Sequence, residues 1–361
     1  MMESVLVKKQ RESGVELLRI LALGGVIMIH FSDKALPLLS VSGGINLSML
    51  LVWRTIASNA VNIFLIISGY FMSTSYRRSL GKPLSLILQV SIYYELAYLV
   101  EVACGIYPLQ LRSVVSSLIP DSYYTTLFVV VYFVSPYINK LMNGLTKQEL
   151  RRFVGMMCLL FSLFSMPSLL LEEATNKQWM GLNTIGAWGS QQGFNIINFL
   201  LCYIIGAYIR MGELPEWTKY RKKKLVGIVL CIALLYSWTL VNQFILHTQG
   251  LRSSWVYDNP IVIMYSVLMF LLFKDFHFSS KLINSLSKAV YATFLIHCAV
   301  IHFVHIDEVC LLPWYEFVCY YLLFTVVMFV LSYFVFMIYE KFTQKIFKSL
   351  DNYCFELNRE L

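Results

Sequence analysis

ELLRILALGGVIMIH, residues 16–30, is an apolar run that Arg19 interrupts and His30 ends. The two side chains are eleven positions apart, which at about 100° per residue places them within about 20° of one helix face. At 1.5 Å per residue they are separated by roughly 16 Å along the helix axis. In a hydrocarbon core about 30 Å thick, ionisable side chains at this depth usually face a cavity or a partner. We therefore expect Arg19 and His30 to line a water-accessible passage, and this face is the leading candidate site.

The composition is that of a membrane protein. Hydrophobic residues make up 58% and charged residues only 14% of the 361 positions, a charge share well below that of soluble domains. The eight cysteines are scattered and form no CxxC pair, so the sequence predicts neither a disulfide framework nor a zinc site, and we expect no metal. No small-residue cleavage site closes the first apolar run, which predicts that this run is retained as a membrane span.

The order of apolar segments predicts an all-α polytopic membrane protein of about ten transmembrane helices, with a single domain over residues 1–361. Asn259 and Pro260 form a plausible cap and first-turn proline for the eighth span. The predicted spans are about 15–36, 47–72, 84–106, 122–139, 153–171, 194–210, 225–246, 259–274, 289–306 and 314–339.

The loop charges test this count independently. With the N-terminus in the cytoplasm, 24 of the 29 Lys and Arg residues fall on the cytoplasmic side and five fall outside. The positive-inside rule predicts such an asymmetry for an even number of spans with both termini cytoplasmic. The net charge of +8 therefore indicates a basic rim beside anionic lipid, and nothing further supports a nucleic-acid partner.

The longest predicted outer loop, about 172–193, combines carboxylates, tryptophans and amides, among them Glu173 and Trp188. These side chains suit a sugar-binding surface, because the rings can stack on pyranose faces while the polar groups meet hydroxyls. The alternative is an interfacial aromatic belt with solvated acids.

The second predicted span carries polar and small residues. Asn59 and Asn62 share a helix face at i, i+3, while Ser68-Gly69 lies near the cytoplasmic end, shortly before Arg77-Arg78. Small residues in a membrane helix let another backbone or a ligand come close. Two interpretations follow: a packing notch between helices, or an opening beside two arginines for an anionic, phosphate-bearing donor.

Several motifs, taken in chain order, resemble the acyltransferase-3 family of integral membrane acyltransferases, especially the bacterial polysaccharide O-acetyltransferases. Arg19 and His30 are similar to that family's Arg-x10-His arrangement. Tyr123-Tyr124-Thr125 departs from the family, in which a Tyr-Trp-Phe cluster is common here. The other segments that carry the resemblance are Glu16-Leu17-Leu18, Asn62-Ile63-Phe64, Ser68-Gly69-Tyr70, Ser135-Pro136-Tyr137-Ile138-Asn139, Ile205-Gly206-Ala207-Tyr208-Ile209-Arg210 and Tyr291-Ala292-Thr293-Phe294-Leu295-Ile296-His297.

The resemblance implies transfer of an acyl group, usually acetyl from acetyl-CoA, to a hydroxyl of a cell-surface glycan or its lipid-linked precursor at the bacterial plasma membrane. It implies no permanently bound cofactor. Arg19, near the cytoplasmic mouth, is expected to hold a CoA phosphate or carbonyl. His30, toward the outer leaflet, is expected to be a general base for the acceptor hydroxyl or a transient acyl carrier. The further donor-binding candidates are Ser68, Gly69, Tyr70, Arg77 and Arg78.

Two more ionisable residues are candidates. Glu95 lies near the middle of the third predicted span, where a carboxylate needs a proton or a cationic partner. It is expected to orient His30, to pair with Arg19, or to belong to a purely structural pair. His297, in the ninth span, is expected to line the reaction cavity, the alternative being a hydrogen bond to a neighbouring helix. The predicted acceptor-binding residues are Asn59, Asn62, His297, Glu173 and Trp188.

Two rival function classes remain. A transporter or flippase of lipid-linked sugars would also contain buried Arg, His and Glu among many spans, although no inverted repeat or matched pair of interrupted helices is visible. A membrane polymerase or ligase for surface polysaccharide would be expected to carry a much larger outer loop than about 172–193.

Overall fold

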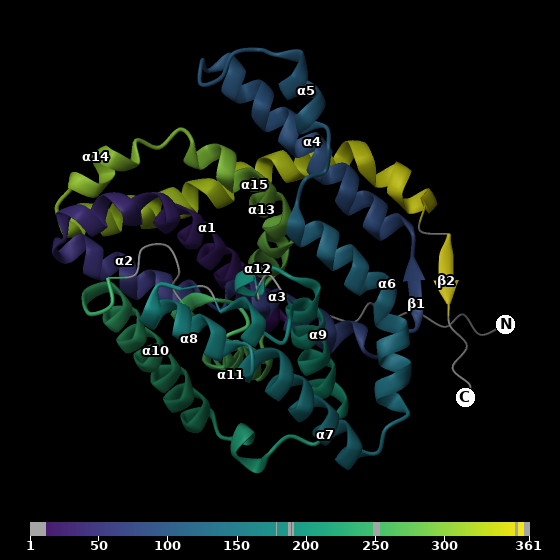
Figure 1. Ribbon diagram of the computed structural model, residues 1–361. Coiled ribbons are helices and arrows are strands. Elements are labelled where there is room, and N and C mark those ends of the chain that lie inside the picture. Colours follow the sequence, from purple (N-terminus) through teal and green to yellow (C-terminus); the bar gives the residue numbers. More distant parts are fainter. Residues whose placement is uncertain are drawn as a thin grey trace.

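The computed structural model describes residues 12–177, 179–186, 189, 191–247, 253–350 and 353–356, and this part of the chain is helical almost throughout (Figure 1). The all-α prediction is therefore confirmed. The α-helices are α1 (Ser13–Ser42), α2 (Gly44–Ala57), α3 (Ala60–Met72), α4 (Gly81–Ala103), α5 (Leu111–Ser117), α6 (Tyr123–Asn143), α7 (Lys147–Cys158), α8 (Met166–Thr175), α9 (Ile196–Met211), α10 (Arg221–Phe244), α11 (Pro260–Lys274), α12 (Lys281–Leu286), α13 (Val290–Ile301), α14 (Ile306–Leu311) and α15 (Trp314–Leu350).

Shorter elements connect these helices. A π-helical turn at Leu159–Leu163 joins α7 to the segment before α8, and two short strands, β1 (Arg77–Ser79) and β2 (Cys354–Glu356), pair antiparallel. The 3-10 turns are Met180–Leu182, Gln191–Gly193, Glu216–Lys219, Ser253–Trp255 and Ser287–Ala289.

Eight helical segments of the described chain are long and apolar enough to cross a membrane. Two of the predicted spans are shorter: α9 has 16 residues and α13 has 12. Both lie against other helices of the bundle, α9 against α3 and α6, and α13 against α1, α4 and α15. The prediction of ten crossings stays a prediction, because it needs these two short helices to complete the path.

Helix α1 lies at the centre of the bundle and contacts α2, α3, α11 and α13. Sequence analysis ends this span near residue 36, whereas the helix continues through Pro37 to Ser42. A proline is tolerated within a membrane helix because neighbouring groups satisfy the freed carbonyl. The second predicted span, 47–72, is interrupted at Ser58 and Asn59, which separate α2 from α3. The fifth is divided by the π-helical turn.

Two glycines let the backbones of α3 and α9 approach each other closely. A Cβ atom at Gly69 would lie 2.0 Å from the carbonyl oxygen of Tyr203, and one at Gly206 would lie 2.1 Å from that of Ile66. Each glycine therefore lets the facing backbone approach to a distance that no other residue allows. Small residues at this crossing fix the position of α3, which forms a wall of the candidate site.

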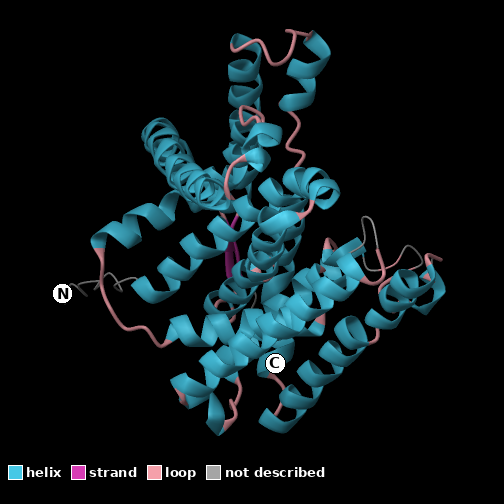
Figure 2. Cartoon of the chain, turned by 90° about the vertical axis from the view of Figure 1, so that its left-hand side faces the viewer, coloured by secondary structure: helices cyan, strands magenta, loops and turns pink. Residues whose placement is uncertain are grey.

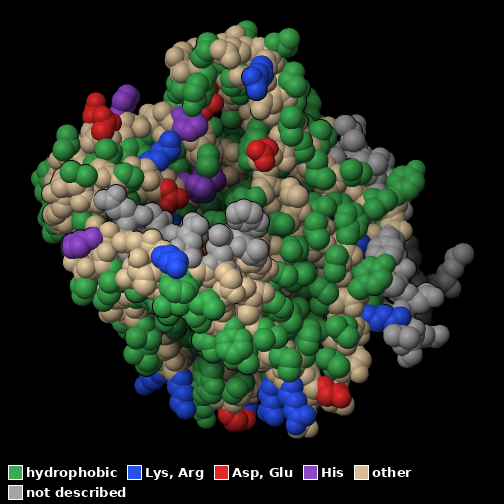
Figure 3. Space-filling model, in the orientation of Figure 1, with side chains coloured by type: hydrophobic (Ala, Val, Ile, Leu, Met, Phe, Trp, Pro, Cys, Tyr) green, Lys and Arg blue, Asp and Glu red, His purple; other side chains and the backbone are tan. Residues whose placement is uncertain are grey.

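On the face that Figure 3 shows, many of the basic side chains lie at one end of the molecule. Figure 3 shows a dense group of Lys and Arg along the lower edge, near the starts of α7 and α10, whereas the visible histidines lie in the upper half. At the opposite end, α4 and the short α5 project beyond the other helices (Figures 1 and 2). This separation of charge agrees with the inner and outer sides that the loop charges predict.

Candidate active site

Arg19 and His30, both on α1, line two different cavities. His30 lines a cavity of about 890 Å³, which we call the His30 cavity; Asp33, Arg54 and Trp255 also line it. Aromatic and amide side chains complete much of its wall: Tyr123, Gln192, Phe194, Gln243 and Tyr257. The combination of flat rings, amides and one ion pair is typical of a polar ligand site with apolar faces.

Arg19 lines a smaller pocket of about 280 Å³, which we call the Arg19 pocket. Two lysines from other elements, Lys82 at the start of α4 and Lys288 just before α13, also line it. Ser68 on α3 and Tyr124 on α6 contribute to the wall. Its described charged lining is therefore wholly cationic, as a phosphate-bearing ligand requires.

A carboxylate one turn away holds Arg19. The Nη1 atom of Arg19 donates to both carboxylate oxygens of Glu16, at 3.0 and 3.1 Å. Glu16 is buried, whereas the Arg19 side chain is about one third exposed (32%). The guanidinium is therefore oriented from one side by Glu16, while the Arg19 side chain also lines the pocket.

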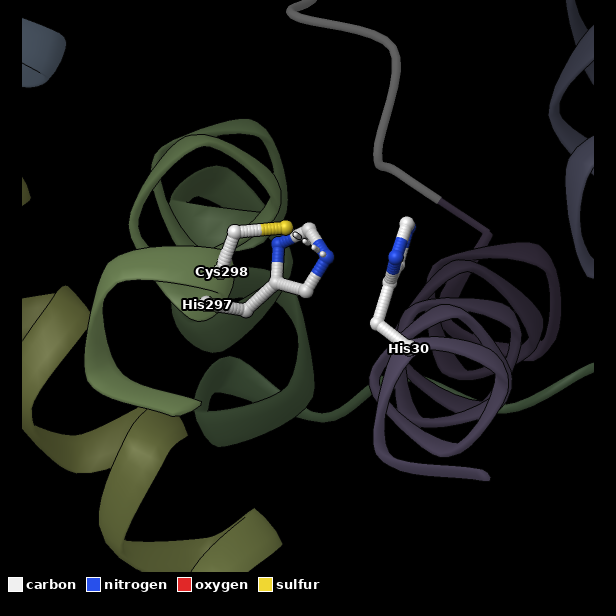
Figure 4. A group of neighbouring side chains, drawn as sticks. All are labelled: His30, His297 and Cys298. Carbon is white, nitrogen blue, oxygen red and sulfur yellow. Dashed lines mark hydrogen bonds between the residues drawn. The ribbon is translucent and has the colours of Figure 1, made fainter. Parts of the chain in front are cut away.

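A cluster of three side chains, His30, His297 and Cys298, lies where the middle of α1 meets the second half of α13, and we call it the His–Cys cluster (Figure 4). The two imidazole centroids are 4.8 Å apart. The Nδ1 atom of His297 lies 2.5 Å from the carbonyl oxygen of Phe294, which it meets as a donor. The Nε2 atom of His297 then carries the lone pair, and it lies 3.4 Å from the Cys298 sulfur. The structure thus brings His297 beside His30, although His297 itself is not among the residues that line the His30 cavity.

The same cluster has donor atoms that a metal ion can use. One ligand atom from each side chain lies within 4.8 Å of the other two. The ligand types, two imidazoles and a thiol, suit a zinc-like ion. The expectation of no metal is not tested by this geometry and stays a prediction.

Aromatic rings separate the two spaces. Phe294 lines the Arg19 pocket, and its ring centroid is 5.8 Å from that of His297 and 5.3 Å from that of Tyr124. In the described part of the chain, Arg19 and His30 therefore line two different cavities, rather than the single passage that the sequence alone suggested. They face two spaces with an aromatic partition between them.

Arg78 is placed in a structural role rather than in the Arg19 pocket. Its guanidinium donates to the backbone carbonyls of Met72, Ser75, Arg77 and Tyr132 and to the Ser135 hydroxyl, at 2.7–3.2 Å. These contacts occupy all five N–H groups, so none remains for a donor phosphate.

The other predicted donor-binding residues are dispersed. Only Ser68 lines the Arg19 pocket, and its hydroxyl donates to Phe64 O at 2.8 Å. Gly69 faces α9, which favours the packing interpretation of the Ser68-Gly69 pair. Tyr70 accepts a hydrogen bond from Arg210 at 2.9 Å and lies outside the described pocket lining, and exposed Arg77 lies on β1.

None of the described acceptor-binding candidates is among the residues that line the His30 cavity. Apart from His297, which lies beside His30, one of them contacts a residue of the cavity wall, and the others lie elsewhere. Asn62 donates to Tyr257 O at 2.7 Å and accepts from Asn198 at 3.2 Å, which fixes the backbone of one wall residue. Asn59 is buried where α2 meets α3. Buried Glu173 accepts hydrogen bonds from Asn242 and from the Ser253 amide, so it is not a surface for sugars. Trp188 lies outside the described residues.

Glu95 contacts neither Arg19 nor His30. Its carboxylate accepts a hydrogen bond from Ser117 on α5, near the projecting end of α4. The structure therefore favours the purely structural alternative for Glu95, as a link between α4 and α5.

Four charged lining residues were missed as site candidates: Asp33, Arg54, Lys82 and Lys288. Asp33 follows His30 at i+3, so helix periodicity could have placed both on one face. Arg54 lies inside a predicted span, where an ionisable residue is itself a functional signal. Lys82 and Lys288 precede spans and gave no signal beyond their contribution to the basic rim.

Comparison with known proteins gives a family for this chain. The search finds no match among curated proteins or solved structures. The family model described as an acyltransferase domain, acyltransferase-3, matches residues 12–337, which include both the Arg19 pocket and the His30 cavity. The chain therefore belongs to the acyltransferase-3 family and is a membrane acyltransferase.

Proposed function

We propose that this acyltransferase moves an acetyl group from cytoplasmic acetyl-CoA to a hydroxyl of a surface polysaccharide or its lipid-linked precursor in the bacterial plasma membrane. The observation that carries the proposal is the pair of spaces along α1, one lined by Arg19 and the other by His30. A reaction with an ionic donor from one side and a sugar acceptor from the other needs two such sites.

The Arg19 pocket suits the donor. Arg19, Lys82 and Lys288 line it from three different elements. An arginine fork and two ammonium groups match the phosphates of CoA, and the phenyl and phenol rings of the wall suit its apolar arm. From Val290 in this pocket to His297, seven residues of α13 rise about 10 Å. A flexible thioester arm of that reach brings the acyl carbon toward His30.

The His–Cys cluster supplies the base. A neutral imidazole at His30 accepts the proton of the acceptor hydroxyl as oxygen attacks the thioester carbonyl, and CoA leaves as the thiol after protonation. His297 faces His30 with its Nδ1 proton committed to Phe294. In this arrangement His297 positions the His30 ring beside the acceptor.

The test uses purified protein in detergent with acetyl-CoA and a glycan acceptor, and it measures CoA release and acetylated product. We expect His30→Ala to abolish turnover while His277→Ala, an exposed histidine between α11 and α12, retains it. Full activity of His30→Ala refutes the catalytic assignment. A protein that consumes no acetyl-CoA but moves lipid-linked sugars across liposomes would instead support the transporter class.

A second measurement tests the donor side. We expect Arg19→Gln and Lys82→Gln each to raise the KM for acetyl-CoA by about tenfold, because a hydrogen bond to a charged group contributes about 1.5–3 kcal/mol. The KM for the acceptor should change little. The reverse pattern, a raised acceptor KM alone, contradicts the assignment of this pocket to the donor.

A further inference from the structure

Arg54 on α2 is a cation in the wall of the His30 cavity that the proposed reaction does not use. Only 14% of its side chain is exposed. Its Nε and Nη1 atoms are buried and have no hydrogen-bond partner among the described residues. A buried charged donor without a partner is costly, so such groups call for a functional explanation.

The contacts of Arg54 fix the position of its guanidinium but leave most of its hydrogen-bond donors unpaired among the described residues. Nη2 lies 3.4 Å from a carboxylate oxygen of Asp33, which is a long contact for a charged pair, and 52% of the Asp33 side chain is exposed. The guanidinium carbon lies 5.1 Å from the ring centroid of Trp255, so the planar group rests on an indole. One face of the fork is therefore stacked, while the N–H edge is largely unused.

The surroundings indicate the kind of ligand. Trp255, Tyr123 and Phe194 line the same cavity as flat apolar faces, and Gln192 and Gln243 add amides. Rings and amides suit a sugar. An arginine fork in such a site adds selectivity for two oxygens that share a negative charge, because guanidinium and carboxylate or phosphate meet through parallel hydrogen bonds.

We propose that the His30 cavity selects an acceptor that carries an oxyanion, and that Arg54, stacked on Trp255, is the residue that recognises it. The oxyanion is the carboxylate of an acidic sugar or the diphosphate of a lipid-linked unit. It replaces the half-exposed Asp33 carboxylate at Nη2 and draws the fork toward the cavity. The role as acceptor rests on the proposed acetyl transfer, whereas anion binding at Arg54 does not.

The experiment measures binding by equilibrium dialysis to the full chain in detergent, with saturating CoA present to occupy the donor site. Methyl glucuronide is compared with methyl glucoside, and geranyl diphosphate with geraniol, so that the two pairs distinguish the carboxylate source from the diphosphate source. The quantity of interest is the ratio of the Kd values of the neutral and charged members of each pair. Thermal unfolding of every variant checks that it is folded.

For at least one pair we expect the wild type to favour the charged member, and Arg54→Gln to reduce that preference by about 10- to 100-fold. Arg54→Lys should keep part of the preference, since it retains the charge and loses the fork. Asp33→Asn should increase the preference by removing a competing carboxylate. If the Asp33–Arg54 pair is merely structural, Arg54→Gln and Asp33→Asn should instead change the preference for the charged ligand in the same direction.

The inference is overturned if the wild type shows no charge preference in either pair, or if Arg54→Gln leaves the preference unchanged in a folded protein. These outcomes are separate from the fate of the proposed function. Acetyl transfer to neutral sugars without any dependence on Arg54 refutes the anion site and leaves the acetyltransferase intact. Anion binding through Arg54 without acetyl-CoA consumption refutes the proposed acetyl transfer and leaves the anion site intact.

Discussion

The substitution Gly69→Ala separates a packing role from a donor-binding role at the end of α3. The new Cβ would lie 2.0 Å from Tyr203 O and 2.8 Å from Tyr203 C. Both atoms belong to the backbone of α9, so no side chain can turn away. The two helices must move apart by about 1.4 Å to bring this contact from 2.0 Å to the 3.4 Å of ordinary van der Waals contact, and overpacking of this kind costs about 1–3 kcal/mol. Because the neighbouring atoms belong to a rigid backbone, we expect a destabilisation near the upper end of this range, about 3 kcal/mol.

The expected net effect is smaller, because alanine improves helix propensity by about 1 kcal/mol over glycine. We therefore expect Gly69→Ala to lower the free energy of unfolding by about 2 kcal/mol, a factor of about 30 in the ratio of folded to unfolded protein. Thermal unfolding followed with a thiol-reactive dye is a suitable assay, since Cys202 on α9 is buried in the folded state.

Two variants control this experiment. Gly155→Ala on α7 places its Cβ in open space, so it should be neutral or slightly stabilising. Gly206→Ala meets Ile66 O at 2.1 Å, so it should reproduce the loss, and the double variant should be less than additive because both act at one crossing. Unchanged stability of Gly69→Ala together with a raised KM for acetyl-CoA would refute the packing argument and restore Gly69 to the donor site.

Three further outcomes are expected. Arg78→Gln should destabilise the protein by about 2–3 kcal/mol, because backbone carbonyls lose charged donors, while the KM for acetyl-CoA in the folded protein stays unchanged. Burial would raise the pKa of Asp275, but hydrogen bonds and charges from Lys224 and Lys274 outweigh it and hold that pKa below its usual value. The stabilisation from Asp275 is therefore full above the unfolded-state pKa and is lost as pH falls through the lowered one, so Asp275→Asn should be less stable than wild type at pH 7 and equal to it in strong acid. Treatment with EDTA should leave acetyl transfer unchanged; loss of activity that zinc restores would show that the His–Cys cluster holds a metal.

Helix periodicity accounts for what the sequence predicts about α1. A spacing of eleven residues puts Arg19 and His30 on one face of the helix, and each of them lines its own cavity. The same reasoning identifies Asn259 and Pro260, where the Asn259 side chain accepts a hydrogen bond from the Ile261 amide at 2.9 Å and Pro260 begins α11. Both inferences use only local geometry along a single helix.

Relations between helices could not be obtained in this way. Arg77 and Arg78 are neighbours in the sequence, yet only the bends around β1 decide which of them enters the interior and meets the carbonyls that end α3. Ser68 and Gly69 are equivalent as small residues, but one faces the Arg19 pocket and the other faces α9. Beside the break at Ser58 and Asn59, Tyr265 on α11 donates a hydrogen bond to the Ile56 carbonyl oxygen at 3.2 Å, a contact that the local sequence does not reveal.

The aromatic partition gives the two-site arrangement a physical reason. A continuous aqueous passage from Arg19 to His30 would expose a thioester to water and would let ions cross the bilayer. Phe294 and Tyr124 separate the two spaces instead, and Phe294 touches both the Arg19 pocket and His297. In the proposed reaction, the apolar rings would exclude water while the narrow, uncharged end of an acylated arm passes them, and the phosphates would stay with the cations of the Arg19 pocket. On that proposal, α1 holds its guanidinium and its imidazole about three turns apart, and one acyl group passes from the first space to the second.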